Sequence, residues 1–147
     1  ANYNCPGQIV ISGPEEGIRS AVESARDTGF KMAKEINVAG AYHSRLMASA
    51  GEAFAKALQA VRFEPPAAPV YTNTTGERIE DPEAIKRALA QQITSPVYFE
   101  DNMRNAVADT GVRQFLECGP GAVLAGFARR TDRNWTVRPA AEYEDFA

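Results

Sequence analysis

The residue of this sequence with the clearest chemical use is His43, the only histidine among 147 residues. Imidazole gains and loses a proton near neutral pH, which suits it to general acid–base catalysis. It lies within Gly40-Ala41-Tyr42-His43-Ser44, a run of mostly small residues ahead of a helical pattern. We therefore expect His43 on a turn at the N-terminal end of a helix, where main-chain N–H groups can meet an anion. A purely structural histidine fits the same pattern, so both interpretations stay open.

A nucleophile for this base is harder to find. No Gly-x-Ser-x-Gly motif, which exposes a catalytic serine in many hydrolases, occurs in the chain. Cys5 and Cys118 are the only thiols and form no Cys-x-x-Cys pair. We expect two reduced thiols, with a disulfide as the alternative, and no metal site. A hydrolase that pairs either cysteine with His43 is a further hypothesis, although no neighbouring charge is evident to activate a thiol.

Two other motifs have both a structural and a functional interpretation. Gly119-Pro120-Gly121 lacks the third glycine of a dinucleotide-binding loop and the Gly-Lys-Ser/Thr of a phosphate loop, so we expect tight strand-to-helix packing there. Arg129, Arg130, Arg133 and Arg138 form a basic C-terminal region. Such a region complements a helix dipole and aids solubility, and the alternative is that it attracts an acidic or phosphorylated partner.

Composition narrows the class of protein. Apolar residues make up 44% and charged residues 24%, which is typical of one ordinary globular domain. Sixteen basic and nineteen acidic residues leave a net charge of −3, which argues against a nucleic-acid partner. No apolar run approaches the roughly 18–20 residues that cross a bilayer, and the start of the chain has no signal-peptide pattern. These features predict a cytoplasmic protein without a membrane segment.

The elements that must position these residues follow from apolar periodicity, caps and breakers. Helices are predicted over residues 14–28, 44–61, 81–92, 98–110 and 123–130. Strands are predicted over residues 2–4, 8–12, 31–38, 70–73 and 112–118, the last of them buried. The alternation of helices and single strands indicates an α/β or α+β fold with a partly parallel sheet.

Four stretches, taken together in this order and spacing, resemble one family. They are Asn2-Tyr3-Asn4-Cys5-Pro6-Gly7-Gln8-Ile9-Val10-Ile11-Ser12-Gly13, Gly40-Ala41-Tyr42-His43-Ser44-Arg45-Leu46-Met47, Gln92 with Ser95-Pro96-Val97, and Phe115-Leu116-Glu117-Cys118-Gly119-Pro120-Gly121 with Val123-Leu124. The family is the malonyl-CoA:acyl-carrier-protein transacylases of fatty-acid synthesis, and the chain resembles their C-terminal half. The resemblance implies an α/β-hydrolase-like large subdomain with an inserted ferredoxin-like small subdomain. Residues 1–37 would end the small subdomain, and residues 38–147 would be the returning part of the large one.

The resemblance also implies a mechanism. In this family a serine attacks the malonyl thioester, coenzyme A leaves, and the phosphopantetheine thiol of acyl carrier protein then takes the malonyl group, with no cofactor. His43 matches the general base, and Gln92 matches the residue whose main-chain carbonyl orients it. The side chain of Gln92 is therefore expected to matter less than the backbone at Ser95-Pro96. Asn4 and Gln8 match a segment that borders the acyl pocket, and the aromatic Tyr42 favours a malonyl unit.

The serine, the arginine that pairs with the malonyl carboxylate and the glycine-rich part of the oxyanion hole have no counterpart in these residues. We therefore expect a fragment that is inactive by itself, with sheet edges and an apolar face left open for a missing N-terminal half. Its other expected partners are acyl carrier protein and the coenzyme A thioester. The alternative is a non-catalytic acyltransferase-like module that binds an acyl carrier protein or a partner subunit.

Overall fold

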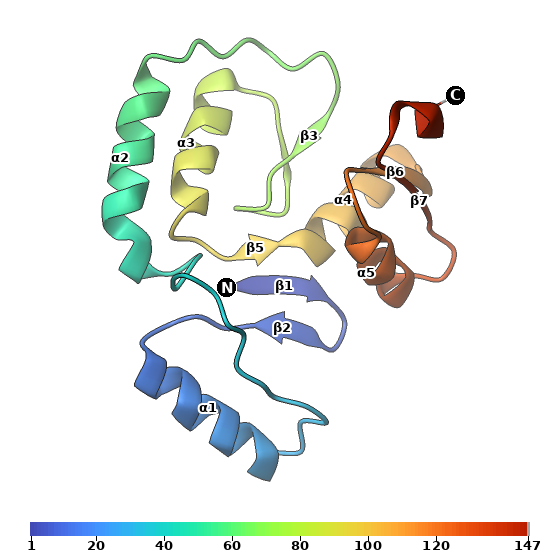
Figure 1. Ribbon diagram of the computed structural model, residues 1–147. Coiled ribbons are helices and arrows are strands. Elements are labelled where there is room, and N and C mark those ends of the chain that lie inside the picture. Colours follow the sequence, from blue (N-terminus) through green and yellow to red (C-terminus); the bar gives the residue numbers. More distant parts are fainter. Residues whose placement is uncertain (147) are drawn as a thin grey trace.

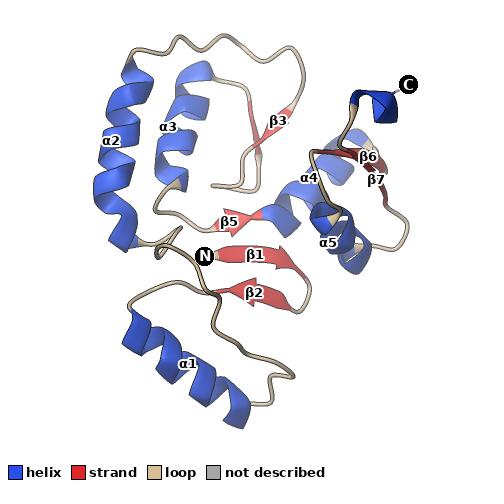
Figure 2. Cartoon of the chain, viewed as in Figure 1, coloured by secondary structure: helices blue, strands red, loops and turns tan. Residues whose placement is uncertain are grey.

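Helices and short strands alternate along residues 1–146, the part of the chain that this computed structural model describes (Figures 1 and 2). The helices are α1 (Glu15–Asp27), α2 (Ala48–Gln59), α3 (Pro82–Gln92), α4 (Phe99–Thr110) and α5 (Val123–Thr131). The strands are β1 (Asn2–Cys5), β2 (Gln8–Val10), β3 (Val70–Tyr71), β4 (Arg78–Ile79), β5 (Val97–Tyr98), β6 (Gln114–Cys118) and β7 (Thr136–Ala140). Two short 3-10 helices cover Arg45–Met47 and Tyr143–Phe146. The α/β class predicted from the sequence is confirmed.

The central sheet joins the start of the chain to its middle. Its strand order is β2-β1-β5, with β1 and β2 antiparallel and β1 and β5 parallel. The hairpin between β1 and β2 turns at Gly7, whose φ of 76° suits glycine. Tyr3 pairs with Tyr98 across the parallel strands, and their rings stack with centroids 5.2 Å apart. This pairing brings the segment after α3 alongside β1.

A second parallel pair closes the C-terminal part. β6 and β7 pair in register over five residues, and α5 forms the crossover between them. Phe115 on β6 and Trp135, just before β7, make an edge-to-face contact at 6.3 Å. The sequence predicted the strand and the helix of this unit but no strand at β7, which contains Pro139, a residue that is uncommon within strands.

Four of the five α-helices of the described chain pack in two pairs beside the central sheet. α2 and α3 lie side by side, while α4 and α5 contact β1 from the other part of the chain (Figure 1). The Asp81 carboxylate caps α3 by accepting the main-chain N–H of Ala84 at 2.8 Å, as the Asp81-Pro82-Glu83 sequence predicts. The other end of α3 lies at the loop that carries His43, since the Gln92 carbonyl is 2.9 Å from His43 Nδ1.

Few side chains are buried, and a large apolar surface is open. The buried apolar residues are Cys5, Leu58, Ala88, Ala128, Trp135 and Ala140. The accessible surface is 10247 Å², whereas a self-contained protein of this mass exposes about 7,300 Å². Met32 is 76% exposed, Phe30 67% and Val123 61%. Large apolar side chains are therefore exposed at several places along the chain.

Two sequence predictions about strands were wrong. Residues 31–38 form a loop rather than a strand, because no described strand lies beside them to complete a ladder and Ile36 and Val38 remain exposed. The strand over 112–118 is present as β6, but it is not buried, since Leu116 is 48% exposed. β5 was missed because two residues carry no periodicity, and pairing with the distant β1 defines that strand. Within residues 1–146, no helix has both the length and the apolar character to cross a membrane.

Candidate active site

The turn that carries His43 is held in an uncommon backbone conformation. His43 has a φ of 58°, in the left-handed region that costs a non-glycine residue about 1 kcal/mol or more. The Ser12 hydroxyl donates to the Tyr42 carbonyl at 2.6 Å, and the Ser44 hydroxyl donates to the Ala41 carbonyl at 2.7 Å. These two hydrogen bonds secure the turn on both sides of the histidine, so the surrounding structure maintains the strained conformation.

The carbonyl of Gln92 meets the imidazole at the end of α3. His43 Nδ1 lies 2.9 Å from this oxygen, so the contact predicted from the sequence is present. The main-chain N–H groups of Thr94 and Ser95 both donate to the Gln91 carbonyl, at 3.0 Å each. The Gln92 carbonyl is therefore left for the imidazole, and it belongs to the negative end of the helix dipole.

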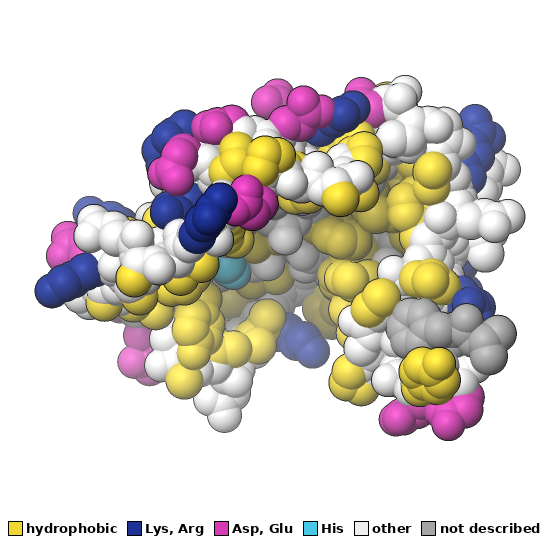
Figure 3. Space-filling view, turned by 90° about the horizontal axis from the view of Figure 1, so that it is seen from above, with side chains coloured by type: hydrophobic (Ala, Val, Ile, Leu, Met, Phe, Trp, Pro, Cys, Tyr) yellow, Lys and Arg dark blue, Asp and Glu magenta, His cyan; other side chains and the backbone are white. Residues whose placement is uncertain are grey.

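This contact determines which ring nitrogen of His43 can act as a base. A carbonyl oxygen only accepts, so Nδ1 must carry the hydrogen, and Nε2 of the neutral ring has a free lone pair. Nε2 makes no hydrogen bond to any residue of the described chain. Figure 3 shows the imidazole, the only cyan atoms, in a hollow rimmed by hydrophobic side chains. The arrangement suits a base that takes a proton from a group in this hollow.

The Gln92 side chain has a role that the sequence did not reveal. Its Nε2 donates to the carbonyls of Ser95 and Pro96 at 2.9 and 3.0 Å, and its Oε1 accepts the Thr74 hydroxyl at 3.2 Å. The sequence predicted a lesser role for this side chain than for the backbone at Ser95-Pro96. In the structure the two are linked, because the side chain itself holds those carbonyls in place.

The other predicted site residues are not hydrogen-bonded to the imidazole. Asn4 Nδ2 donates to Gln8 Oε1 at 3.2 Å across the β1–β2 hairpin, and Tyr42, next to His43, is 47% exposed. None of the three forms a hydrogen bond with His43 among residues 1–146. Their assignment to an acyl pocket remains a prediction.

Both cysteines are free thiols in different surroundings. Cys5 is buried at the end of β1, with Nη1 of Arg130 3.9 Å from its sulfur, whereas Cys118 is exposed at the end of β6. Neither hydrogen-bonds to His43 within the part of the chain that the structure describes. The geometry thus offers no support for a cysteine nucleophile.

The tight packing expected at the Gly-Pro-Gly turn is absent, because a Cβ at Gly119 or Gly121 would meet no atom of another segment within 4 Å. Glu117 instead joins β6 to α5. The buried Glu117 carboxylate accepts the main-chain N–H groups of Leu124 and Ala125, both at 2.9 Å. Gly119 and Gly121 have φ values of 127° and 97°, which allow the chain to reverse between β6 and α5. The N-terminus of α5 is thereby filled by a carboxylate of the protein itself, and sequence reasoning had overlooked this residue.

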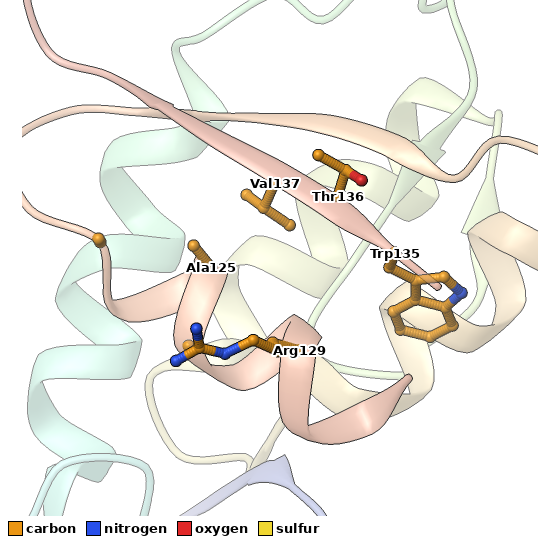
Figure 4. Close-up of a pocket in the computed structure, with 7 residues that line it drawn as sticks. Ala125, Arg129, Trp135, Thr136 and Val137 are labelled. Carbon is orange, nitrogen blue, oxygen red and sulfur yellow. The ribbon is translucent and has the colours of Figure 1, made fainter. Parts of the chain in front are cut away.

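The basic C-terminal region is divided between two places. Arg129, Arg130 and Arg133 line a shallow hollow at the end of α5. Arg129 also borders a second hollow beside Trp135, between α5 and β7 (Figure 4). Arg138 lies apart on β7 and donates to the main-chain oxygen of Asp145. Among residues 1–146, no cluster of three or more histidine, cysteine or carboxylate side chains is arranged to hold a metal ion.

Fold and site together define an α/β domain that presents one histidine, with its Nδ1 on a main-chain carbonyl and no partner for Nε2 among residues 1–146. Residues 1–144 match the acyl transferase domain family, and the chain belongs to that family. It is 40% identical over 133 residues to the malonyl CoA-acyl carrier protein transacylase of Bacillus subtilis (strain 168). The aligned residues cover 90% of this chain and 42% of the relative. The chain thus spans about half the length of the curated relatives it matches.

Solved structures give the same result. The acyl-carrier-protein-S-malonyltransferase of Bartonella henselae superposes with a TM-score of 0.91 at 35% identity, over 99% of this chain and 46% of that one. A malonyl-transacylase in complex with its type II PKS acyl-carrier protein has a TM-score of 0.91 at 31% identity, over 99% of this chain and 47% of that one.

Proposed function

We propose that this chain supplies the general base of a malonyl-CoA:acyl-carrier-protein transacylase. The observation that carries the proposal is the His43 Nδ1 contact with the Gln92 carbonyl, which leaves Nε2 free to accept a proton. Membership of the acyl transferase family and the transacylase names of its relatives support the same substrates.

In the proposed reaction, a serine outside these residues attacks the thioester carbonyl of malonyl-CoA while Nε2 of His43 takes the hydroxyl proton. The proton passes to the departing thiolate of coenzyme A, and a malonyl-serine ester remains. Nε2 then takes the proton of the phosphopantetheine thiol of acyl carrier protein. The thiolate attacks the ester, and the proton returns to serine. Each step is a proton transfer or an acyl transfer, so the reaction requires no cofactor.

Gln92 stabilises the imidazolium that forms in both steps. Its carbonyl accepts the Nδ1 hydrogen throughout, a role that a carboxylate has in many serine enzymes. A helix-terminal carbonyl is less charged than a carboxylate, but the dipole of α3 adds about 0.3–1 kcal/mol in favour of a nearby cation. In this proposal Asn4, Gln8 and Tyr42 border the acyl group, without a direct part in proton transfer.

The proposal extends to the subdomains and the compartment. Residues 1–37 would end a ferredoxin-like small subdomain, and residues 38–147 would complete an α/β-hydrolase-like large one. β1 pairs with β5 across this boundary, so the two parts share a sheet. The other half of the enzyme would cover exposed apolar side chains of this one, and the proposed compartment is the cytoplasm.

The test measures malonyl transfer from malonyl-CoA to holo acyl carrier protein by intact-protein mass spectrometry. It uses the assembled enzyme, whether the serine-bearing half is on the same polypeptide or is a second one. We expect His43→Gln to lower kcat/KM by about a hundredfold or more, while Lys56→Gln, on the exposed surface of α2, leaves it unchanged. The isolated 147-residue chain should transfer malonyl at no more than a trace rate.

Two results would overturn this assignment. Transfer at the wild-type rate by His43→Gln would show that another group is the base. Carrier binding without any transfer by the assembled wild-type protein would instead establish the alternative, a non-catalytic module that docks the carrier.

A further inference from the structure

The turn over residues 72–76 is firmly attached to α4. The Gly76 N–H donates to the Thr72 carbonyl at 2.8 Å, and the Asn105 side chain on α4 donates to the Gly76 carbonyl at 2.7 Å. A Cβ at Gly76 would lie only 2.6 Å from the Cβ of Asp101, so the turn and the helix are in close contact. The turn is therefore a rigid support for the side chains that it carries.

From this turn Thr74 reaches the end of α3, whose place beside the sheet is shown in Figure 1. Its hydroxyl lies 2.8 Å from the Ala88 carbonyl and 3.2 Å from Gln92 Oε1. Both amide hydrogens of Gln92 are used by the carbonyls of Ser95 and Pro96. The Thr74 hydroxyl has one hydrogen for its two acceptors and is the one described donor to Oε1, so it supports the amide orientation that the carbonyls of Ser95 and Pro96 also favour.

We propose that Thr74 is a positioning residue for the histidine site. Its hydroxyl helps to hold the Gln92 side-chain amide, and this amide holds the backbone turn after α3. The turn in its place keeps the Gln92 carbonyl hydrogen-bonded to His43 Nδ1. Thr74 does not touch the imidazole and acts only through Gln92. The consequence for catalysis rests on the proposed function, since it assumes that His43 is the base. Loss of the hydroxyl leaves Oε1 without its described donor, so only the bonds to the carbonyls of Ser95 and Pro96 still hold the amide. The turn then loosens, and the neutral imidazole populates both tautomers.

The first test reads the tautomer directly and needs no enzyme activity. Because His43 is the only histidine in the chain, ring-¹⁵N-histidine labelling gives the two nitrogen signals of a single imidazole in NMR, also when an unlabelled second half is bound. We expect the wild-type ring, when neutral, to carry its hydrogen on Nδ1 and Thr74→Val to give a mixture of tautomers. Thr74→Ser keeps the hydroxyl and should restore the wild-type spectrum.

Thr94→Val is the matched control, because the Thr94 hydroxyl donates to the Gln91 carbonyl at the same helix end and does not contact Gln92. It should leave the tautomer unchanged. If Thr74→Val fails to fold, Gln92→Met removes the same amide from the other side and should give the same mixture. A wild-type tautomer in the folded Thr74→Val or Gln92→Met protein would overturn the proposal.

The second test measures malonyl transfer by the assembled enzyme. Thr74→Val should lower kcat by about tenfold with KM nearly unchanged, since the substrate contacts remain and only the base is misplaced. If the wild-type enzyme transfers no malonyl while the tautomer still responds to Thr74→Val, the proposed function fails and the positioning role stands. If the wild-type enzyme transfers malonyl but Thr74→Val changes neither the tautomer of His43 nor kcat, the positioning role alone fails.

Discussion

Glu117 provides a stringent test of how the C-terminal βαβ unit is held together. The residue is 8% exposed, and its carboxylate accepts two main-chain N–H groups at the start of α5, each at 2.9 Å. Hydrogen bonds to a charged group contribute about 1.5–3 kcal/mol each. Two of them give about 3–6 kcal/mol, and the cost of burying a carboxylate brings the net effect toward the lower end of this range.

We therefore expect Glu117→Ala to lower the free energy of unfolding by about 3 kcal/mol, roughly a hundredfold in the folded-to-unfolded ratio. Glu117→Gln keeps one acceptor but turns its NH₂ group toward the second N–H, so we expect a loss of about 2 kcal/mol. Glu77→Gln changes an exposed carboxylate outside the unit and should stay within about 0.5 kcal/mol of the wild type.

The assay is urea denaturation followed by tryptophan fluorescence. Trp135 is the only tryptophan in the chain, is 7% exposed and contacts Phe115 on β6, so its signal reports on this unit. If both Glu117 variants unfold at the wild-type urea concentration, the carboxylate does not stabilise the α5 terminus and the reasoning is refuted.

Two further predictions concern Gly76 and the side-chain carboxylate of Asp145. In the same urea assay, Gly76→Ala should lower the free energy of unfolding by roughly 2–4 kcal/mol, because the new Cβ would lie 2.6 Å from an α4 side chain. Gly111→Ala is the control, since Gly111 has the same φ of 73° but open space around it, and it should lower the free energy of unfolding by only about 1 kcal/mol. Equal losses in the two variants would refute the clash. The main-chain N–H groups of Glu142 and Ala141 hold the pKa of Asp145 below its ordinary value of 3.8. The stabilising contact is thus complete above pH 3.8 and is lost as the pH falls through the lower folded pKa, so the Ala141 amide shift should change in that acidic range and Asp145→Asn should abolish the change.

Local patterns in the sequence were enough to predict most helices and the residues nearest the chemistry. The Asp81-Pro82-Glu83 start of α3 and the turn at Gly7 depend on neighbours along the chain, and both are present in the structure. His43 was identified by residue type alone, since no other side chain in the sequence exchanges a proton near neutral pH. Its link to Gln92 came from the family resemblance, because no local rule relates residues that far apart.

Tertiary structure alone decided the features that depend on distant pairing. β5 exists because Val97 and Tyr98 pair with β1, and residues 31–38 stay a loop because no described strand pairs with them. The Gln92 side chain gained its role in the same way, since Thr74 reaches it only after the 72–76 turn packs on α4. Local propensity acts over a few residues, whereas hydrogen bonds between separate elements form only when the whole chain is folded. The sequence therefore determined which residue can act as a base, and the fold determined what holds it in place.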